Sequence, residues 1–272
     1  MESEERIKND PIEFPHRYSH PVDIEVTGFI ASSLAYGRID LFKPVLNELF
    51  SRMGNSPADF CSTYLPRRDR KKLHGIRYRF NSEEDFSDLI SLTGRVLKKY
   101  GSLASLFYSF YRDDSEDIRE GLTGFVEHFR SRIKCTGKKR QKWGGGMYHF
   151  LPTPRNGGAC KRMNLFLRWM VRRKGIDFGI WDRIPPSKLI IPLDTHISRI
   201  GYRLGFTRKK GVNWSTAHDI TVKLREFDPL DPVKYDFALC HFGVTGQCPV
   251  QLDVDSCERC RFKGECRVLE LG

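Results

Sequence analysis

The hydrophobic positions of the chain recur mainly at helical spacing. Apolar residues at this spacing predict three amphipathic or buried helices, at 23–35, 42–53 and 86–97. Pro21 precedes the first of these segments and Gly37 follows it, which is typical of a helix start and stop. Strand-like alternation occurs only at 76–80, where basic neighbours favour a loop with at most one strand pair. The pattern therefore predicts a mainly α protein.

The length and composition are those of a folded protein. With 272 residues and 39% hydrophobic residues, the chain can bury a full core as one unit of two lobes. No apolar run reaches the roughly 18 residues of a membrane span, and residues 1–6 lack the apolar stretch of a signal peptide. We therefore expect no membrane partner and a cytoplasmic, nucleoid-associated protein, or a nuclear one if the host is eukaryotic.

Positive charge is concentrated in one part of the chain. The formal net charge is +12, and residues 128–176 hold 14 Lys or Arg with no Asp or Glu. A phosphate backbone is the commonest polyanion that stabilises such a concentration, although a solvated basic face or a surface for acidic lipid also explains it. The densest run predicts DNA phosphate contacts by Lys138, Lys139, Arg140 and Lys142.

Four of the eight cysteines lie close together near the C-terminus. Their order is Cys248-x8-Cys257-x2-Cys260-x5-Cys266. Four thiolates on a compact loop can enclose one zinc ion or one [4Fe–4S] cluster. Structural zinc more often uses two C-x2-C pairs, whereas this loop has only one, so we favour the cluster and keep zinc as the alternative.

Asp194 lies at the predicted start of a helix. Ile197, Ile200 and Leu204 follow it at helical spacing, and Gly205 supplies a stop. A carboxylate at a helix N-terminus is held in its charged form by backbone N–H groups and the helix dipole. Such a group can stabilise a sugar cation while a glycosidic bond breaks, but an isolated Asp in this position is more often only a cap.

Two segments carry a family resemblance. Residues 193–200 (LDTHISRI), followed by the four-cysteine loop, resemble the V-D-T-H-x-x-R-V segment and C-x6-C-x2-C-x5-C loop of endonuclease III. That enzyme belongs to the helix-hairpin-helix DNA glycosylase superfamily. Residues 168–170 (RWM) and 234–239 (KYDFAL) are closer still to an uncharacterised family, domain of unknown function 2400.

The resemblance implies a site and a fold. Asp194 corresponds to the catalytic aspartate, and residues 159–167 (ACKRMNLFL) align with G-R-K-T-A-N-V-V-L, which places Lys161 at the nucleophilic lysine. A longer form of the family's hairpin corresponds to residues 151–164. Further DNA contacts are then expected at Arg155, Asn156, Gly157, Gly158, Arg162 and His196. Candidates to line the base pocket are Tyr36, His149 and Trp181.

The expected fold is mainly α and two-lobed, similar to a helix-hairpin-helix DNA glycosylase with a C-terminal iron–sulfur loop. Residues 1–30 and 206–272 would form the cluster-bearing lobe, and residues 31–205 the central helical lobe. The expected function is excision of a damaged or mismatched base from double-stranded DNA by a monomer, with abasic-site lyase activity if Lys161 is a nucleophile. The alternative is a non-catalytic iron–sulfur protein that binds nucleic acid and keeps a vestigial glycosylase site.

Overall fold

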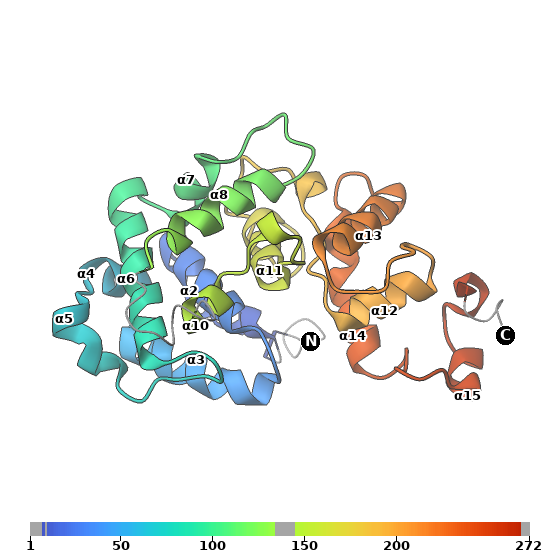
Figure 1. Cartoon of the computed structure of the whole chain (residues 1–272), viewed down its shortest axis with the longest axis horizontal. Coiled ribbons are helices and arrows are strands. Elements are labelled where there is room, and N and C mark those ends of the chain that lie inside the picture. The colour runs from blue at the N-terminus through green and yellow to red at the C-terminus, as the bar shows by residue number, and fades with distance from the viewer. Residues whose placement is uncertain (1–6, 9, 134–144, 268–272) are drawn as a thin grey trace.

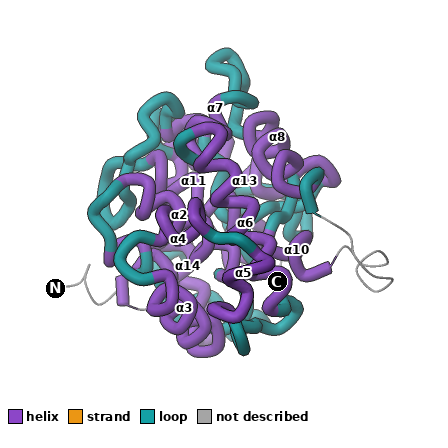
Figure 2. Tube along the Cα trace, turned by 90° about the vertical axis from the view of Figure 1, so that its left-hand side faces the viewer, coloured by secondary structure: helices purple, strands orange, loops and turns teal. Residues whose placement is uncertain are grey.

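The structure is a computed structural model that describes residues 7–8, 10–133 and 145–267. Within these residues helices dominate and no strand forms, which confirms the predicted mainly α class (Figures 1 and 2). The first helices are α2 (Pro21–Leu34), α3 (Ile39–Met53), α4 (Pro57–Thr63), α5 (Pro66–Asp69), α6 (Glu83–Tyr100), α7 (Leu103–Tyr108) and α8 (Arg119–Arg130). The later ones are α10 (Gly145–Phe150), α11 (Lys161–Val171), α12 (Thr195–Arg203), α13 (Trp214–Phe227), α14 (Asp236–Val244) and α15 (Val254–Glu258).

Short 3-10 helices connect several of these elements. They are η1 (Pro11–Glu13), η2 (Pro15–Arg17), η3 (Arg70–Leu73), η4 (Pro154–Asn156), η5 (Pro186–Lys188), η6 (Pro232–Tyr235) and η7 (Lys263–Glu265). The three helices predicted from apolar spacing are found as α2, α3 and α6. The region predicted at 76–80 contains a single bridge between Tyr78 and Asn81, so it is a tight turn rather than a strand pair. None of the described helices is long and apolar enough to cross a membrane.

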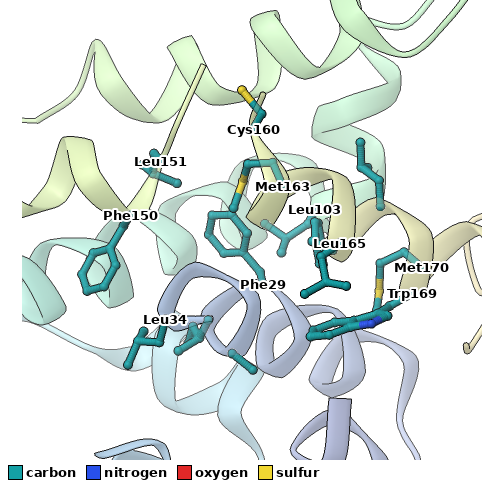
Figure 3. Close-up of a cluster of buried hydrophobic side chains, with 14 of the residues drawn as sticks. Phe29, Leu34, Leu103, Phe150, Leu151, Cys160, Met163, Leu165, Trp169 and Met170 are labelled. Carbon is teal, nitrogen blue, oxygen red and sulfur yellow. The ribbon is translucent and has the colours of Figure 1, made fainter. Parts of the chain in front are cut away.

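The core is built around the pairing of α2 with α11. Phe29 on α2 contacts Phe166 on α11 and Phe125 on α8, with ring centroids 5.6 and 5.7 Å apart. Figure 3 shows Phe29 in one buried cluster with Met163 and Trp169 of α11. The two central helices approach closely at Gly28, where an added Cβ would lie 3.0 Å from the Met170 side chain. Twelve of the fourteen residues of α2 are buried, as expected for a helix that is apolar on nearly all sides.

Helix α2 lies at the centre of the helical core. Residues 11–34 make their main contacts with α4, α7 and α11. The physical reason is that α2 has no polar face to leave in solvent. The C-terminal group of helices consists of α12, α13 and α14 (Figure 1). The division with residues 1–30 and 206–272 in one lobe and residues 31–205 in the other stays a prediction.

A helix, a tight connection and a second helix follow one another at the predicted hairpin. The connection between α10 and α11 contains η4 and turns at Gly157, which has the left-handed φ of +78° that glycine adopts without strain. The Gly157 carbonyl accepts a hydrogen bond from the Trp214 backbone N–H (2.8 Å). The hairpin is thereby attached to the start of α13.

Candidate functional site

Lys161 and Asp194 lie together between the α2–α11 core and the C-terminal helices. Lys161 is the first residue of α11, and Asp194 is the N-cap of α12. The Lys161 ammonium donates to Asp194 Oδ2 at 3.0 Å, while Asp194 Oδ1 accepts the backbone N–H of Ile197 at 2.9 Å. The predicted helix cap is therefore present, and each carboxylate oxygen has its own donor.

The two charges stabilise each other. Burial alone would raise the pKa of Asp194, but the Lys161 ammonium and the Ile197 N–H outweigh it and hold that pKa below its usual range. Burial would lower the pKa of Lys161, yet the Asp194 carboxylate outweighs burial and raises that pKa. At neutral pH the site therefore holds a fixed carboxylate beside a protonated amine.

Cys240 on α14 is a third member of the site. Its thiol donates to Asp194 Oδ2 at 3.7 Å, the same oxygen that Lys161 contacts. Burial and the nearby Asp194 charge raise the pKa of Cys240 to about 12, so the sulfur keeps its proton and remains a donor. Sequence reasoning placed no role on Cys240, because a lone cysteine in a helix carries no local signal.

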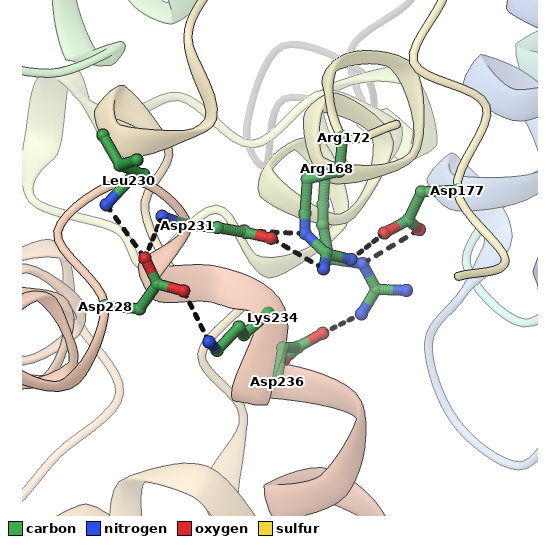
Figure 4. A network of polar contacts seen from close by, with 8 residues as sticks. All are labelled: Arg168, Arg172, Asp177, Asp228, Leu230, Asp231, Lys234 and Asp236. Carbon is green, nitrogen blue, oxygen red and sulfur yellow. Dashed lines mark hydrogen bonds and ion pairs between the residues drawn. The ribbon is translucent and has the colours of Figure 1, made fainter. Parts of the chain in front are cut away.

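A buried network of charges fixes α11 against the C-terminal helices (Figure 4). Arg168, two turns after Lys161, pairs with Asp177 at 3.3 Å and also with Asp236, the first residue of α14. Burial raises the pKa of Asp236 to about 6 even though Arg168 opposes this. Removing one partner of such a buried pair costs about 3–5 kcal/mol, so this network positions the helices that carry the site.

The network continues at the exposed end of α11. Arg172 pairs with Asp177 and, at 2.8 Å, with Asp231 in the segment before η6. Asp228 accepts the backbone N–H groups of Leu230 and Asp231, which shapes that segment (Figure 4). Arg168 and Asp236 belong to the two segments that resemble domain of unknown function 2400, and their pairing brings those segments together.

The hairpin residues lie beside an acidic cavity. Arg155 and Asn156 are exposed, and Asn156 and Gly157 line a cavity of about 890 Å³ together with Trp214. The segment 112–120 lines the same cavity with four carboxylates against two arginines. Because carboxylates repel phosphate, the predicted DNA contacts of Arg155, Asn156, Gly157 and Gly158 receive no support from this arrangement and stay predictions.

Arg162 differs from its prediction as a DNA contact. Its guanidinium is buried and donates to the backbone carbonyls of Ser33 (2.9 Å) and His149. It also lies 4.9 Å from the centre of the Tyr36 ring. Arg162 therefore joins α2, α10 and α11 inside the protein instead of facing solvent. His196 is half-buried, with Nδ1 3.2 Å from an Arg199 nitrogen.

Two of the three base-pocket candidates lie together. Tyr36 and His149 meet edge to face, with ring centroids 4.4 Å apart. Trp181 is instead a core residue, only 1% exposed, whose indole N–H donates to Glu25 at 2.7 Å. The Trp181 ring packs against Phe107 and other core rings, so this arrangement gives no support to its prediction as a base-pocket residue, which stays a prediction. The basic run Lys138, Lys139, Arg140 and Lys142 lies outside the described residues.

Comparison with protein families gives one match. A family model described as a protein of unknown function (DUF2400) matches residues 10–245. The chain belongs to this family. No curated protein matches the chain. The DUF2400 match includes Lys161, Asp194 and Cys240, and it ends three residues before Cys248.

The four clustered cysteines lie beyond the DUF2400 match. Their donor chemistry fits a thiolate site, because Arg203 donates to Cys248 Sγ (3.1 Å) and the Phe262 N–H donates to Cys260 Sγ (3.4 Å). Cys248 and Cys257 are buried, while Cys260 and Cys266 are half-buried. Within the described part of the chain, however, no three His, Cys, Asp or Glu residues converge as metal ligands. The iron–sulfur cluster therefore stays a prediction.

Proposed function

We propose that this protein is a DNA glycosylase that excises a damaged or mismatched base, with abasic-site lyase activity. The observation that carries the proposal is the ion pair between Lys161 and Asp194, two residues that the endonuclease III resemblance had assigned independently to catalysis. A cap alone needs no lysine partner, and a lysine that only contacts phosphate needs no carboxylate partner.

The chemistry follows from the two charges. As the bond between C1′ and the base nitrogen breaks, the base leaves with the electron pair and positive charge develops on the sugar. Asp194 supplies a fixed negative charge to stabilise that cation, and its orientation is set by the Ile197 N–H, Lys161 and Cys240. No proton needs to leave Asp194 for this role, which agrees with its lowered pKa.

Lys161 supplies the second activity. Water captures the sugar cation and leaves an abasic sugar, which opens to an aldehyde at C1′. Once the Lys161 amine loses a proton, Nζ adds to C1′ and water leaves, which gives a Schiff base; loss of the C2′ proton to solvent then breaks the bond between C3′ and its phosphate oxygen. The raised pKa of Lys161 means that the amine is protonated in the free protein at neutral pH. We therefore infer that base release is the faster step and strand cleavage the slower one.

A [4Fe–4S] cluster held by Cys248, Cys257, Cys260 and Cys266 is part of the proposal, with zinc as the alternative. Bound there, the cluster would supply cross-linking of a C-terminal loop that has little apolar core of its own. No catalytic step depends on it. The partner is double-stranded DNA with a lesion or mismatch, bound by a monomer that is nucleoid-associated, or nuclear in a eukaryotic host.

The non-catalytic alternative is favoured by one observation, the four carboxylates that share a cavity with the hairpin. They make that hairpin a poor phosphate site, which is expected if the glycosylase site is vestigial.

A panel of duplexes decides between the two functions. Each duplex carries one oxidised purine, oxidised pyrimidine, uracil or mismatch, and both base release and strand nicking are measured. Release from at least one duplex, lost in Asp194→Asn, supports the enzyme. Binding to every duplex without release from any would contradict it and favour the vestigial binder.

A further inference from the structure

One aromatic ring projects from the surface next to the base-pocket candidates. Phe80 is 64% exposed and lies in the tight turn from Tyr78 to Asn81. The turn is closed by two backbone hydrogen bonds, from Tyr78 N–H to the Asn81 carbonyl (2.9 Å) and from Asn81 N–H to the Tyr78 carbonyl (2.8 Å). A single exposed Phe is common on protein surfaces, so what distinguishes Phe80 is the way its turn and the neighbouring rings hold it in place.

The backbone beneath the ring is strained and held in place. Arg79 has a left-handed φ of +49°, a conformation that non-glycine residues keep only where the surroundings impose it. Gly37 leaves room for the Arg79 guanidinium, because a Cβ at position 37 would lie 2.5 Å from Arg79 Nη1. Asn81 donates to the Gly146 carbonyl (2.6 Å) and accepts from the Tyr36 hydroxyl (2.5 Å). The turn is therefore anchored to α10, the helix that leads into the hairpin.

The rings of His149 and Tyr36 lie near the Phe80 ring. His149 lies 5.2 Å from Phe80 and 4.4 Å from Tyr36, edge to face with both. The Phe80 and Tyr36 planes are inclined by only 12°. His149 Nε2 is buried and has no hydrogen-bond partner among the described residues. Phe80 is thus a rigid ring with one supported side and most of its surface in solvent.

The surroundings of the ring are cationic. Arg77 and Arg79 are exposed, and the Arg79 guanidinium lies 5.5 Å from the centre of the Phe80 ring. A flat ring in an exposed basic turn matches an unpaired nucleotide, whose base offers a face for stacking while its phosphates carry negative charge. A lipid surface would need a wider apolar patch than this single ring.

We propose that Phe80 is a stacking platform for an unpaired DNA base, with Arg77 and Arg79 contacting the flanking phosphates. This inference rests on the proposed function in taking DNA as the partner, and it adds a binding site on the turn 78–81 that is separate from the Lys161–Asp194 pair. It also explains why the strained turn is anchored to the hairpin helix instead of relaxing.

The test measures binding alone, on the full-length protein. A labelled single-stranded dT oligonucleotide and a duplex of equal length are titrated with the wild type and with Phe80→Ala, Phe80→Trp and Phe227→Ala. Phe227 is the matched control because it is 63% exposed and lies on α13. We expect Phe80→Ala to weaken single-strand binding about fivefold or more, and duplex binding less. Phe80→Trp should keep the affinity, and its additional fluorescence should be quenched by the oligonucleotide.

Each outcome decides the proposal. Wild-type affinity in Phe80→Ala, an equal loss in Phe227→Ala, or no binding of the oligonucleotide by the wild type would overturn it. The same holds if the additional fluorescence of the Phe80→Trp variant stays unquenched at saturating oligonucleotide. The glycosylase proposal is tested separately, because base release is measured in another assay. If the protein releases a base but Phe80→Ala binds the oligonucleotide normally, only the stacking platform is refuted. If Phe80→Ala weakens binding but no base is released, only the glycosylase activity is refuted.

Discussion

Lys161 Nζ lies 3.0 Å from Asp194 Oδ2, although 33 residues separate the two in the chain. The contact joins the first residue of α11 to the cap of α12. It is therefore an interaction between the central helices and the C-terminal helices, and not a local feature of either. The first two predictions below test its two members separately.

Replacing Asp194 by Asn should abolish most base release. Asn caps helices almost as well as Asp, so the Ile197 N–H keeps an acceptor while the negative charge is lost. We expect the single-turnover rate of release to fall by about 100-fold or more, with DNA affinity largely retained. The matched control is Asp253→Asn, which changes the N-cap of α15 in the same way and should leave the rate unchanged. A fully active Asp194→Asn variant would reduce Asp194 to a cap.

Replacing Lys161 by Gln should abolish the borohydride-trapped adduct with abasic DNA. The variant lacks the amine that forms the Schiff base. In the wild type the yield of adduct should rise as the pH rises above neutral, because the raised pKa keeps the amine protonated at lower pH. Lys209→Gln is the control, since Lys209 is also ion-paired, to Asp219 at 2.9 Å. An adduct that persists in Lys161→Gln at saturating DNA would assign the lysine to phosphate binding.

Replacing Cys257 by Ser should remove the cluster. Iron content and the absorbance at about 400 nm of anaerobically purified protein should both fall, since one of four thiolate ligands is lost. The control is Cys61→Ala, which alters a buried cysteine on α4 and should keep full iron. Full iron in Cys257→Ser would contradict the ligand assignment, and zinc in place of iron in the wild type would establish the alternative.

Replacing Glu25 by Gln should change the pH dependence of stability. The Glu25 carboxylate accepts from the Leu103 N–H (2.9 Å) and the Trp181 indole (2.7 Å), yet burial raises its pKa from 4.5 to about 7. The folded state then holds a proton that the unfolded state has released, so the free energy of unfolding falls as the pH rises from 4.5 to 7. The wild type should lose up to about 3 kcal/mol over this range relative to Glu25→Gln.

Urea titrations of both proteins at several pH values measure that difference. Asp236, whose pKa is also raised, is present in both and cancels in the comparison. If the free energy of unfolding changes with pH in the same way for both proteins, Glu25 is not protonated in the folded state near neutral pH.

The sequence by itself determined the helical class and most local features. Apolar spacing located α2, α3 and α6, and the order of residues after Asp194 located the cap of α12, because helix periodicity and capping depend only on neighbours within a few positions. Glycines and prolines likewise indicated the connection before Lys161. Local signals could not predict that Arg162 and Trp181 are buried, since the exposed fraction of a side chain depends on what packs against it.

Only the tertiary structure decided which of these features meet. It brought Lys161 and Cys240 to the same carboxylate oxygen of Asp194. It also buried Trp181 in the core and left Phe80 in solvent. Finally, it placed α2 at the centre of the core, because a helix that is apolar on nearly all sides is buried on all of them. Contacts between residues far apart in the chain arise from the packing of whole helices, and no short stretch of sequence carries that information.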